Sequence, residues 1–150
     1  MKRAVFPGSF DPITLGHQDI INKGLRVFDE IIIGIGENSD KKYMFSAEKR
    51  FEFVSTTFDK LKKIDVKCYN GLTVDFCKEN DAQFIIRGLR NPADFEFEKS
   101  IALTNREMTG IETVFLLTDS KNSFISSSIV RELIKNKGDY KLFIPKGLSI

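Results

Sequence analysis

Short apolar runs alternate along the chain with segments in which apolar residues recur every three or four positions. Short runs are typical of strands, and the wider spacing is typical of amphipathic helices. Each expected strand is followed by an expected helix. The expected strands are residues 3–6, 30–35, 64–68, 83–87 and 112–117, and the expected helices are residues 16–28, 47–58 with Ser46 as cap, 73–80, 92–108 and 128–135.

This alternation predicts an α/β fold with a doubly wound, five-stranded parallel sheet of the Rossmann-like type. Residues 30–35 are nearly all isoleucine, which indicates a strand buried on both faces. The chain of 150 residues can bury one core, and no linker interrupts it, so we expect a single domain over residues 1–150. In such sheets ligands bind beyond the carboxyl ends of the strands, and the loops at those ends are therefore the places to look for a site.

Composition and charge exclude several classes of protein. The net charge of +2 does not indicate the continuous basic face that a nucleic-acid-binding protein needs. No stretch reaches the ~20 apolar residues of a membrane helix, and no signal peptide follows Met1, so we expect a cytoplasmic protein without a membrane partner. A single histidine excludes a multi-histidine metal site. We expect Cys68 and Cys77 to be buried thiols, because their spacing fits no metal or redox motif.

The loop after the first strand, residues 7–17, contains two prolines and two glycines and ends on the only histidine. His17 falls in the first turn of the expected helix, where free backbone N–H groups and the helix dipole favour an anion. The loop lacks the Gly-Lys-Ser/Thr of a Walker motif and the G-x-G-x-x-G pattern. Asp11 and Thr14 have an alternative interpretation as turn and capping residues.

Three later loops carry further groups that suit phosphate. Either Lys41 or Lys42 provides an ammonium group for a phosphate, or the two form an exposed pair. The Arg-Gly-Leu-Arg segment at 87–90 offers two planar guanidinium groups that can each form bidentate hydrogen bonds to a phosphate. If Arg87 ends a buried strand, its charge also needs a partner. We expect one of the serines at 126–128 to cap the following helix, and with Arg131 the three form a second candidate anion-binding site.

The motif Gly-x-Phe-Asp-Pro followed by Thr-x-Gly-His resembles the nucleotidyltransferase superfamily that is related to class I aminoacyl-tRNA synthetases. Together with Lys-Lys-x-Met-Phe, Ile-Arg-Gly-Leu-Arg, Ala-Asp-Phe-Glu-Phe-Glu and Phe-Ile-Ser-Ser-Ser, it resembles the bacterial phosphopantetheine adenylyltransferase family from Arg3 to about Pro145. The resemblance implies reversible transfer of an adenylyl group from ATP to 4′-phosphopantetheine, giving dephospho-CoA and pyrophosphate. It implies catalysis by positioning and charge stabilisation, without a covalent intermediate.

The resemblance also implies a role for each matching residue, with His17 as the catalytic stabiliser of phosphate charge. The residues implied to bind ATP are Ser9, Phe10, His17, Gly88, Leu89, Arg90, Glu98, Asn122, Ser123, Phe124, Ile125, Ser126, Ser127 and Ser128. The residues implied to bind phosphopantetheine are Ser9, Lys41, Thr73 and Arg87. Three positions depart from the family pattern: Ser9 replaces a frequent threonine, Thr73 a larger apolar residue, and Asn122 a frequent tryptophan.

Further properties follow from the resemblance alone: Mg²⁺ held through the ATP phosphates rather than by side chains, assembly as a homohexamer, and feedback inhibition by coenzyme A. Two alternatives remain at this point. One is another enzyme of the superfamily, acting on nicotinamide or nicotinate mononucleotide or as a cytidylyltransferase, against which residues 87–98 argue. The other is a non-catalytic nucleotide-binding module, which the presence of His17, Lys41, Arg87 and Arg90 disfavours.

Overall fold

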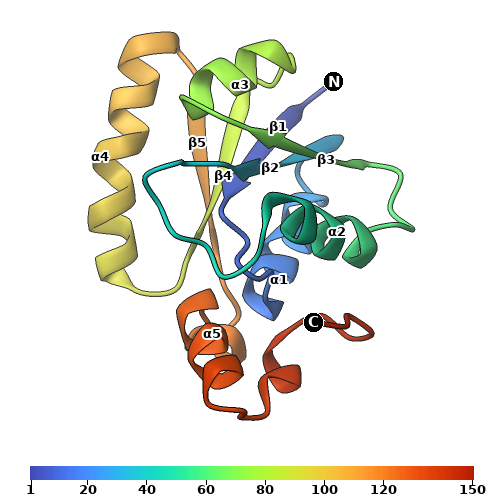
Figure 1. Cartoon of the computed structure of the whole chain (residues 1–150). Coiled ribbons are helices and arrows are strands. Elements are labelled where there is room, and N and C mark those ends of the chain that lie inside the picture. The colour runs from blue at the N-terminus through green and yellow to red at the C-terminus, as the bar shows by residue number, and fades with distance from the viewer.

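A computed structural model describes all residues from 1 to 150. Its strands form one sheet in the order β3-β2-β1-β4-β5, and every neighbouring pair is parallel (Figure 1). The predicted fold class is confirmed. The strands are β1 (Arg3–Gly8), β2 (Glu30–Gly36), β3 (Ile64–Tyr69), β4 (Phe84–Leu89) and β5 (Glu112–Leu117).

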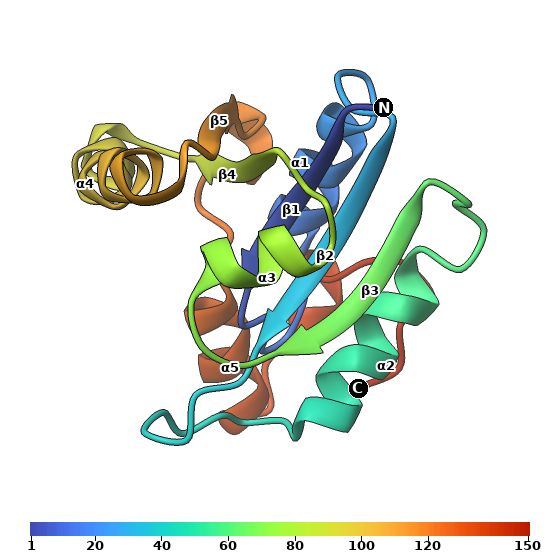
Figure 2. The ribbon, with the colours of Figure 1, turned by 90° about the horizontal axis from the view of Figure 1, so that it is seen from above.

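Helices follow the strands as the sequence predicts, and short 3₁₀ turns are added near the C-terminus. The helices are α1 (Leu15–Gly24), α2 (Ala47–Thr57), α3 (Thr73–Glu79), α4 (Pro92–Thr109), α5 (Ser127–Lys135), η1 (Ser120–Asn122) and η2 (Tyr140–Phe143). Helices α1 and α2 cover one face of the sheet, and α3 and α4 cover the other (Figure 2). Helix α5 lies beyond the end of the sheet (Figure 1). No helix has the length and apolar character that a membrane span requires.

The two sheet faces carry separate apolar cores because neighbouring residues of a strand point to opposite sides. On one face Ile31 and Ile33 pack with residues of α1 and α2, and on the other Val5 and Ile32 pack with residues of α3. Strand β2 is buried on both sides from Ile31 to Ile35, as predicted. Helix α1 packs so closely on this face of the sheet that a Cβ added to Gly24 would lie 2.8 Å from Ile31 Cδ1.

Several predicted bounds and one predicted burial state are wrong. Helix α1 ends at Gly24 rather than at residue 28, because the next residues form a turn in which the N–H of Phe28 donates to Gly24. Strand β4 continues two residues beyond Arg87, and α5 begins one residue earlier than expected. Cys77 is buried, and burial raises its pKa to about 12, but Cys68 is exposed because β3 is an edge strand.

The order of the strands places a switch point between β1 and β4. The chain moves outward from β1 through β2 to β3, then returns to the other side of β1 for β4. Strand β1 stays paired with β2 as far as Gly8, but its pairing with β4 covers only Ala4 and Val5. The carboxyl ends of β1 and β4 therefore separate, and a crevice opens where ligands of such folds bind.

Candidate active site

Two hollows meet at this crevice. The α4-side hollow has a volume of about 350 Å³, and its lining includes Tyr69 at the end of β3 and Asn105 of α4. The α5-side hollow has about 450 Å³ and is lined by the first loop, the start of α1, the end of β4 and the start of α5. The residues that line both are Pro7, Gly8, Ser9, Lys41, Arg87 and Glu98. Ligands in the two hollows would therefore meet at a wall that carries Lys41 and Arg87.

His17 lines the α5-side hollow from the first turn of α1. Thr14 caps this helix: its hydroxyl accepts from the His17 backbone N–H at 3.4 Å, and its own N–H donates to His17 Nδ1 at 3.0 Å. A backbone N–H can only donate, so Nδ1 is the acceptor and the ring proton of the neutral imidazole belongs to Nε2. Capping was the alternative interpretation of Thr14, and the structure confirms it and adds that the cap fixes the tautomer of the histidine.

The His17 ring is held in its neutral form. Burial, together with the positive charges of Arg87 and Arg90, lowers its pKa from 6.5 to about 4. The imidazole therefore stays neutral near pH 7 and offers one N–H donor at Nε2. Such a group stabilises negative charge on an oxygen but is a weak general base.

Arg87 bridges the crevice from β4 to β1. Its Nε and Nη2 donate to the two carboxylate oxygens of Glu98 at 2.9 and 2.5 Å, and Nη1 donates to the carbonyl of Pro7 at 2.8 Å. Arg87 is half-buried, and it has the partner that the sequence required. This carboxylate belongs to the acidic segment in the first two turns of α4. The bidentate pair fixes the plane of the guanidinium in the wall between the two hollows.

Arg90 and Lys41 approach the same region from two loops. Arg90 pairs with Asp94 through its Nε at 3.2 Å. Burial raises the pKa of Asp94, but hydrogen bonds from Arg90 outweigh this and leave the pKa below its ordinary value. Lys41 Nζ donates to the hydroxyl of Ser9 at 3.0 Å, whereas Lys42 lines neither hollow. Both lysines are exposed, and only Lys41 reaches the site.

The three serines before α5 have three different partners. Ser126 caps the helix by accepting from the N–H of Ile129 at 3.2 Å, which confirms that one of them is a cap. Ser127 donates to the carbonyl of Pro12 at 2.8 Å, and Ser128 accepts from Arg131 at 3.1 Å. These bonds dock the first turn of α5 on the first loop, and its free backbone N–H groups lie beside the α5-side hollow.

Comparison with known proteins agrees with this geometry. A family model described as cytidylyltransferase-like matches residues 5–133. A phosphopantetheine adenylyltransferase of Flavobacterium johnsoniae is 57% identical over 150 residues, which are 100% of this chain and 99% of the relative. One of Bacteroides fragilis is 45% identical over 100% of both chains. The chain belongs to the phosphopantetheine adenylyltransferase family.

A solved structure shares the fold at much lower sequence identity. The bifunctional NMN adenylyltransferase/ADP ribose pyrophosphatase of Francisella tularensis superposes with a TM-score of 0.76 at 16% identity. The match covers 97% of this chain and 45% of that one. The fold of this chain is therefore shared with part of that protein.

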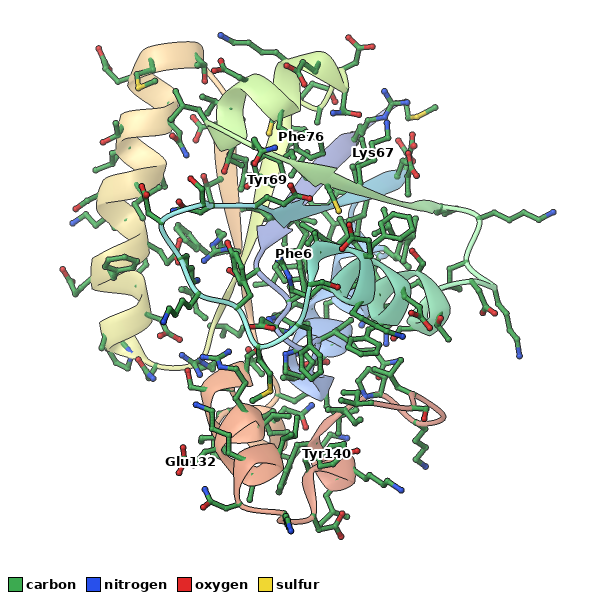
Figure 3. The ribbon with its side chains drawn as sticks, in the orientation of Figure 1. Phe6, Lys67, Tyr69, Phe76, Glu132 and Tyr140 are labelled. Atoms are coloured by element: carbon green, nitrogen blue, oxygen red, sulfur yellow. The ribbon has the colours of Figure 1, made fainter.

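The remaining residues that the family resemblance singled out fall in three places. Thr73 begins α3 and lines the α4-side hollow, where its hydroxyl shares a 2.9 Å hydrogen bond with Tyr69. The ring of Tyr69 stacks on that of Phe76 with 4.4 Å between the ring centroids; both residues are labelled in Figure 3. Gly88 lines the α5-side hollow, and a Cβ there would lie 2.8 Å from Ile20 Cγ1, so its packing also requires glycine. The α5-side hollow is also lined by Phe10 and Ile125. Neither hollow is lined by Leu89, Asn122, Ser123 or Phe124.

Sequence reasoning missed the contacts that hold the loops to one another. The buried carboxylate of Asp11 accepts from the backbone N–H groups of Met44 and Phe45, both at 2.9 Å. Arg131 donates to the carbonyl of Asp11 at 2.8 Å. Arg50 lies on the apolar face of its helix, four residues before Val54, and that position was the available signal for a buried cation.

Proposed function

We propose that this chain transfers the adenylyl group of ATP to 4′-phosphopantetheine, giving dephospho-CoA and pyrophosphate in a reversible reaction. The observation that carries the proposal is the pair of hollows joined at Ser9, Lys41 and Arg87, with His17 in one of them. ATP would occupy the α5-side hollow and the acceptor the α4-side hollow. Their phosphates would then meet at the shared wall. Relatives with this activity in their name match the chain over its whole length.

In the reaction, a phosphate oxygen of the acceptor attacks the α-phosphorus of ATP. The bond between the α-phosphorus and the oxygen bridging to the β-phosphate breaks, and pyrophosphate leaves with the electron pair. The acceptor phosphate is already ionised near neutral pH, so no general base is needed and no covalent intermediate forms. His17 Nε2–H would donate to an α-phosphate oxygen as negative charge increases there.

The main obstacle to the reaction is repulsion between the acceptor phosphate and the triphosphate of ATP, which must be aligned for the attack. Lys41 and the Arg87 fork lie in the wall between the hollows, and Arg90 lies on the ATP side. Their charges offset the repulsion, and because Glu98 holds the Arg87 fork, little reorganisation is needed when substrates bind. The start of α5 would hold the leaving pyrophosphate.

The carboxylates at the site already have other partners, which supports a Mg²⁺ ion held through ATP rather than by side chains. Glu98 is paired with Arg87, Asp94 with Arg90, and Asp11 with two backbone N–H groups. Magnesium is readily held through phosphate oxygens while keeping several waters. When bound in this way, the ion supplies further neutralisation of the triphosphate.

Two regulatory and assembly properties belong to the same proposal. Coenzyme A carries both a pantetheine arm and an adenine nucleotide, so it would fill the two joined hollows and act as a feedback inhibitor competing with both substrates. We also propose a homohexamer. The support for self-association is the apolar surface of α4, where Phe97, Leu103 and Met108 are 70%, 45% and 56% exposed.

Measurement of pyrophosphate release with a panel of acceptors tests the proposed function. We expect rapid release only with ATP plus 4′-phosphopantetheine. Pantetheine is the matched control, because it lacks only the attacking phosphate and should be inert. Faster release with nicotinamide or nicotinate mononucleotide, or with CTP in place of ATP, would assign the chain to another reaction of the superfamily. Binding of ATP without turnover of any acceptor would make it a binding module.

A further inference from the structure

Arg50 is the largest of the fully buried side chains, with 1% of its surface exposed. It lies in the first turns of α2, and its guanidinium reaches away from the helix toward the crevice. Nη1 donates to the carbonyls of Ser9 at 2.9 Å and Gly36 at 3.0 Å, and Nε donates to the carbonyl of Phe45 at 3.2 Å. One side chain thus connects the end of β2, the first loop and the loop that precedes α2.

The charge of Arg50 has no carboxylate partner. None of the ion pairs of the structure includes this residue, and its neighbours are carbonyl oxygens and the ring of Tyr43, which lies 3.9 Å from the guanidinium carbon. A buried cation that is satisfied only by neutral groups costs free energy compared with an apolar side chain of similar size. A role in the stability of the core alone therefore does not account for arginine at this position.

Two of the three carbonyls that Arg50 holds belong to residues of the proposed acceptor site. Ser9 and Gly36 line the α4-side hollow, and the hydroxyl of Ser9 accepts from Lys41. The residue after Ser9 is Phe10, a non-glycine residue at a φ of 49°, a conformation that persists only where the surroundings hold it. Arg50 therefore holds the backbone carbonyl of Ser9, while Lys41 donates to the hydroxyl of its side chain.

We propose that Arg50 is a positioning residue for the transfer reaction, acting through Ser9 and Lys41. By joining the first loop to residues 38–45, it places the Lys41 ammonium at the wall where the acceptor phosphate meets ATP. This inference rests on the proposed function, because it concerns the acceptor side of that same site. Loss of the guanidinium should therefore impair use of the acceptor more than binding of ATP.

The first variant is Arg50→Lys, which keeps a buried cation. Its single nitrogen cannot replace the two guanidinium nitrogens that reach three carbonyls, and it cannot lie flat on Tyr43. We expect kcat/KM for phosphopantetheine to fall at least about tenfold, since small displacements of reacting groups have effects of this size or larger. The Kd for ATP should change by less than about threefold. The matched control is Lys49→Met, which removes an exposed cation from the adjacent position of the same helix and should leave both values unchanged.

A double-mutant cycle with Lys41→Met separates positioning from general destabilisation. If Arg50 acts through Lys41, then Arg50→Lys should reduce kcat/KM by less than about threefold when Lys41 is already absent. Equal losses in the two backgrounds, or an unchanged Arg50→Lys enzyme, would overturn the inference. If Arg50→Lys does not fold, Tyr43→Leu, which removes the ring beneath the guanidinium, goes through the same cycle with the same two outcomes. Wild-type protein that does not turn over phosphopantetheine would instead refute the proposed function itself.

Discussion

At the scale of single residues, the sequence predicts that His17 stabilises phosphate charge but does not predict the protonation state of its ring. His17 was identifiable from its place in a strand–loop–helix motif. Its tautomer follows from the hydrogen bond that Thr14 N–H donates to Nδ1, and its low pKa follows from burial and from Arg87 and Arg90. Both arginines lie about seventy residues away in the chain. A local pattern contains no information about such neighbours.

The Nε2–H donor of His17 predicts the order of catalytic activity among variants at this position. His17→Ala should lower kcat by about 10²-fold or more, as expected for the loss of one preorganised donor. His17→Gln should retain more activity than His17→Asn, because the longer amide can place an N–H near the position of Nε2 whereas the shorter one matches Nδ1. Steady-state kinetics on the three folded variants tests this ranking. Near-normal turnover of His17→Ala would contradict the role assigned to the residue.

The same histidine predicts a dependence of stability on pH. The pKa is 6.5 in the unfolded chain and about 4 in the folded protein, so between these values the unfolded state binds a proton that the folded state does not. The free energy of unfolding should therefore fall as pH drops from about 6.5 toward 4. Urea unfolding at intervals across this range, with His17→Gln as comparison, measures the effect. The prediction is contradicted if the free energy of unfolding changes with pH equally in the variant and the wild type.

At the scale of elements, local sequence signals located the starts of helices, whereas long-range contacts determined where helices end and how loops are held. Ser46 and the serines before α5 were recognisable as caps, and both assignments hold. The role of Asp11 was not recognisable, because the backbone groups that it binds lie 33 and 34 residues further along the chain. The bounds of α1 were missed for a related reason. Phe28 continues the apolar spacing and is buried, yet it lies in a turn.

The two serine caps form a matched pair of variants. Ser46→Ala and Ser126→Ala each remove a hydroxyl that accepts a backbone N–H, and each should lower the free energy of unfolding by about 1 kcal/mol. Only Ser126→Ala loosens the helix start beside the α5-side hollow, so only this variant should raise KM for ATP. Chemical unfolding and ATP-dependent kinetics on both variants check the prediction. An equal rise in KM for both would show that the effect is one of stability alone.

At the scale of the whole molecule, the alternation of strands and helices predicted the class of fold and the edge that carries the site. The crevice itself was not predictable, since it depends on where β4 returns beside β1 and on how early the two strands part. The joined hollows, and the position of Arg87 in the wall between them, are consequences of that topology. They bring separate candidate anion-binding loops together in the one site that we propose for two substrates.

The exposed apolar residues of α4 lead to a prediction about assembly. Light scattering coupled to size exclusion should give a mass six times that of the 17.1 kDa chain. Met108→Glu places a charge on the exposed surface of α4 and should shift the mass to smaller species, whereas Lys49→Glu, on α2, should not. A mass of one chain for the wild type at every concentration tested would contradict the predicted hexamer.

The central claim is that both substrates bind side by side and that the adenylyl group passes directly between them. Exchange of labelled pyrophosphate into ATP tests this most directly. Direct transfer predicts exchange only when phosphopantetheine is present, because ATP cannot release pyrophosphate without an acceptor to attack it. Exchange at a comparable rate with enzyme and ATP alone would reveal a covalent adenylyl-enzyme and would contradict the account.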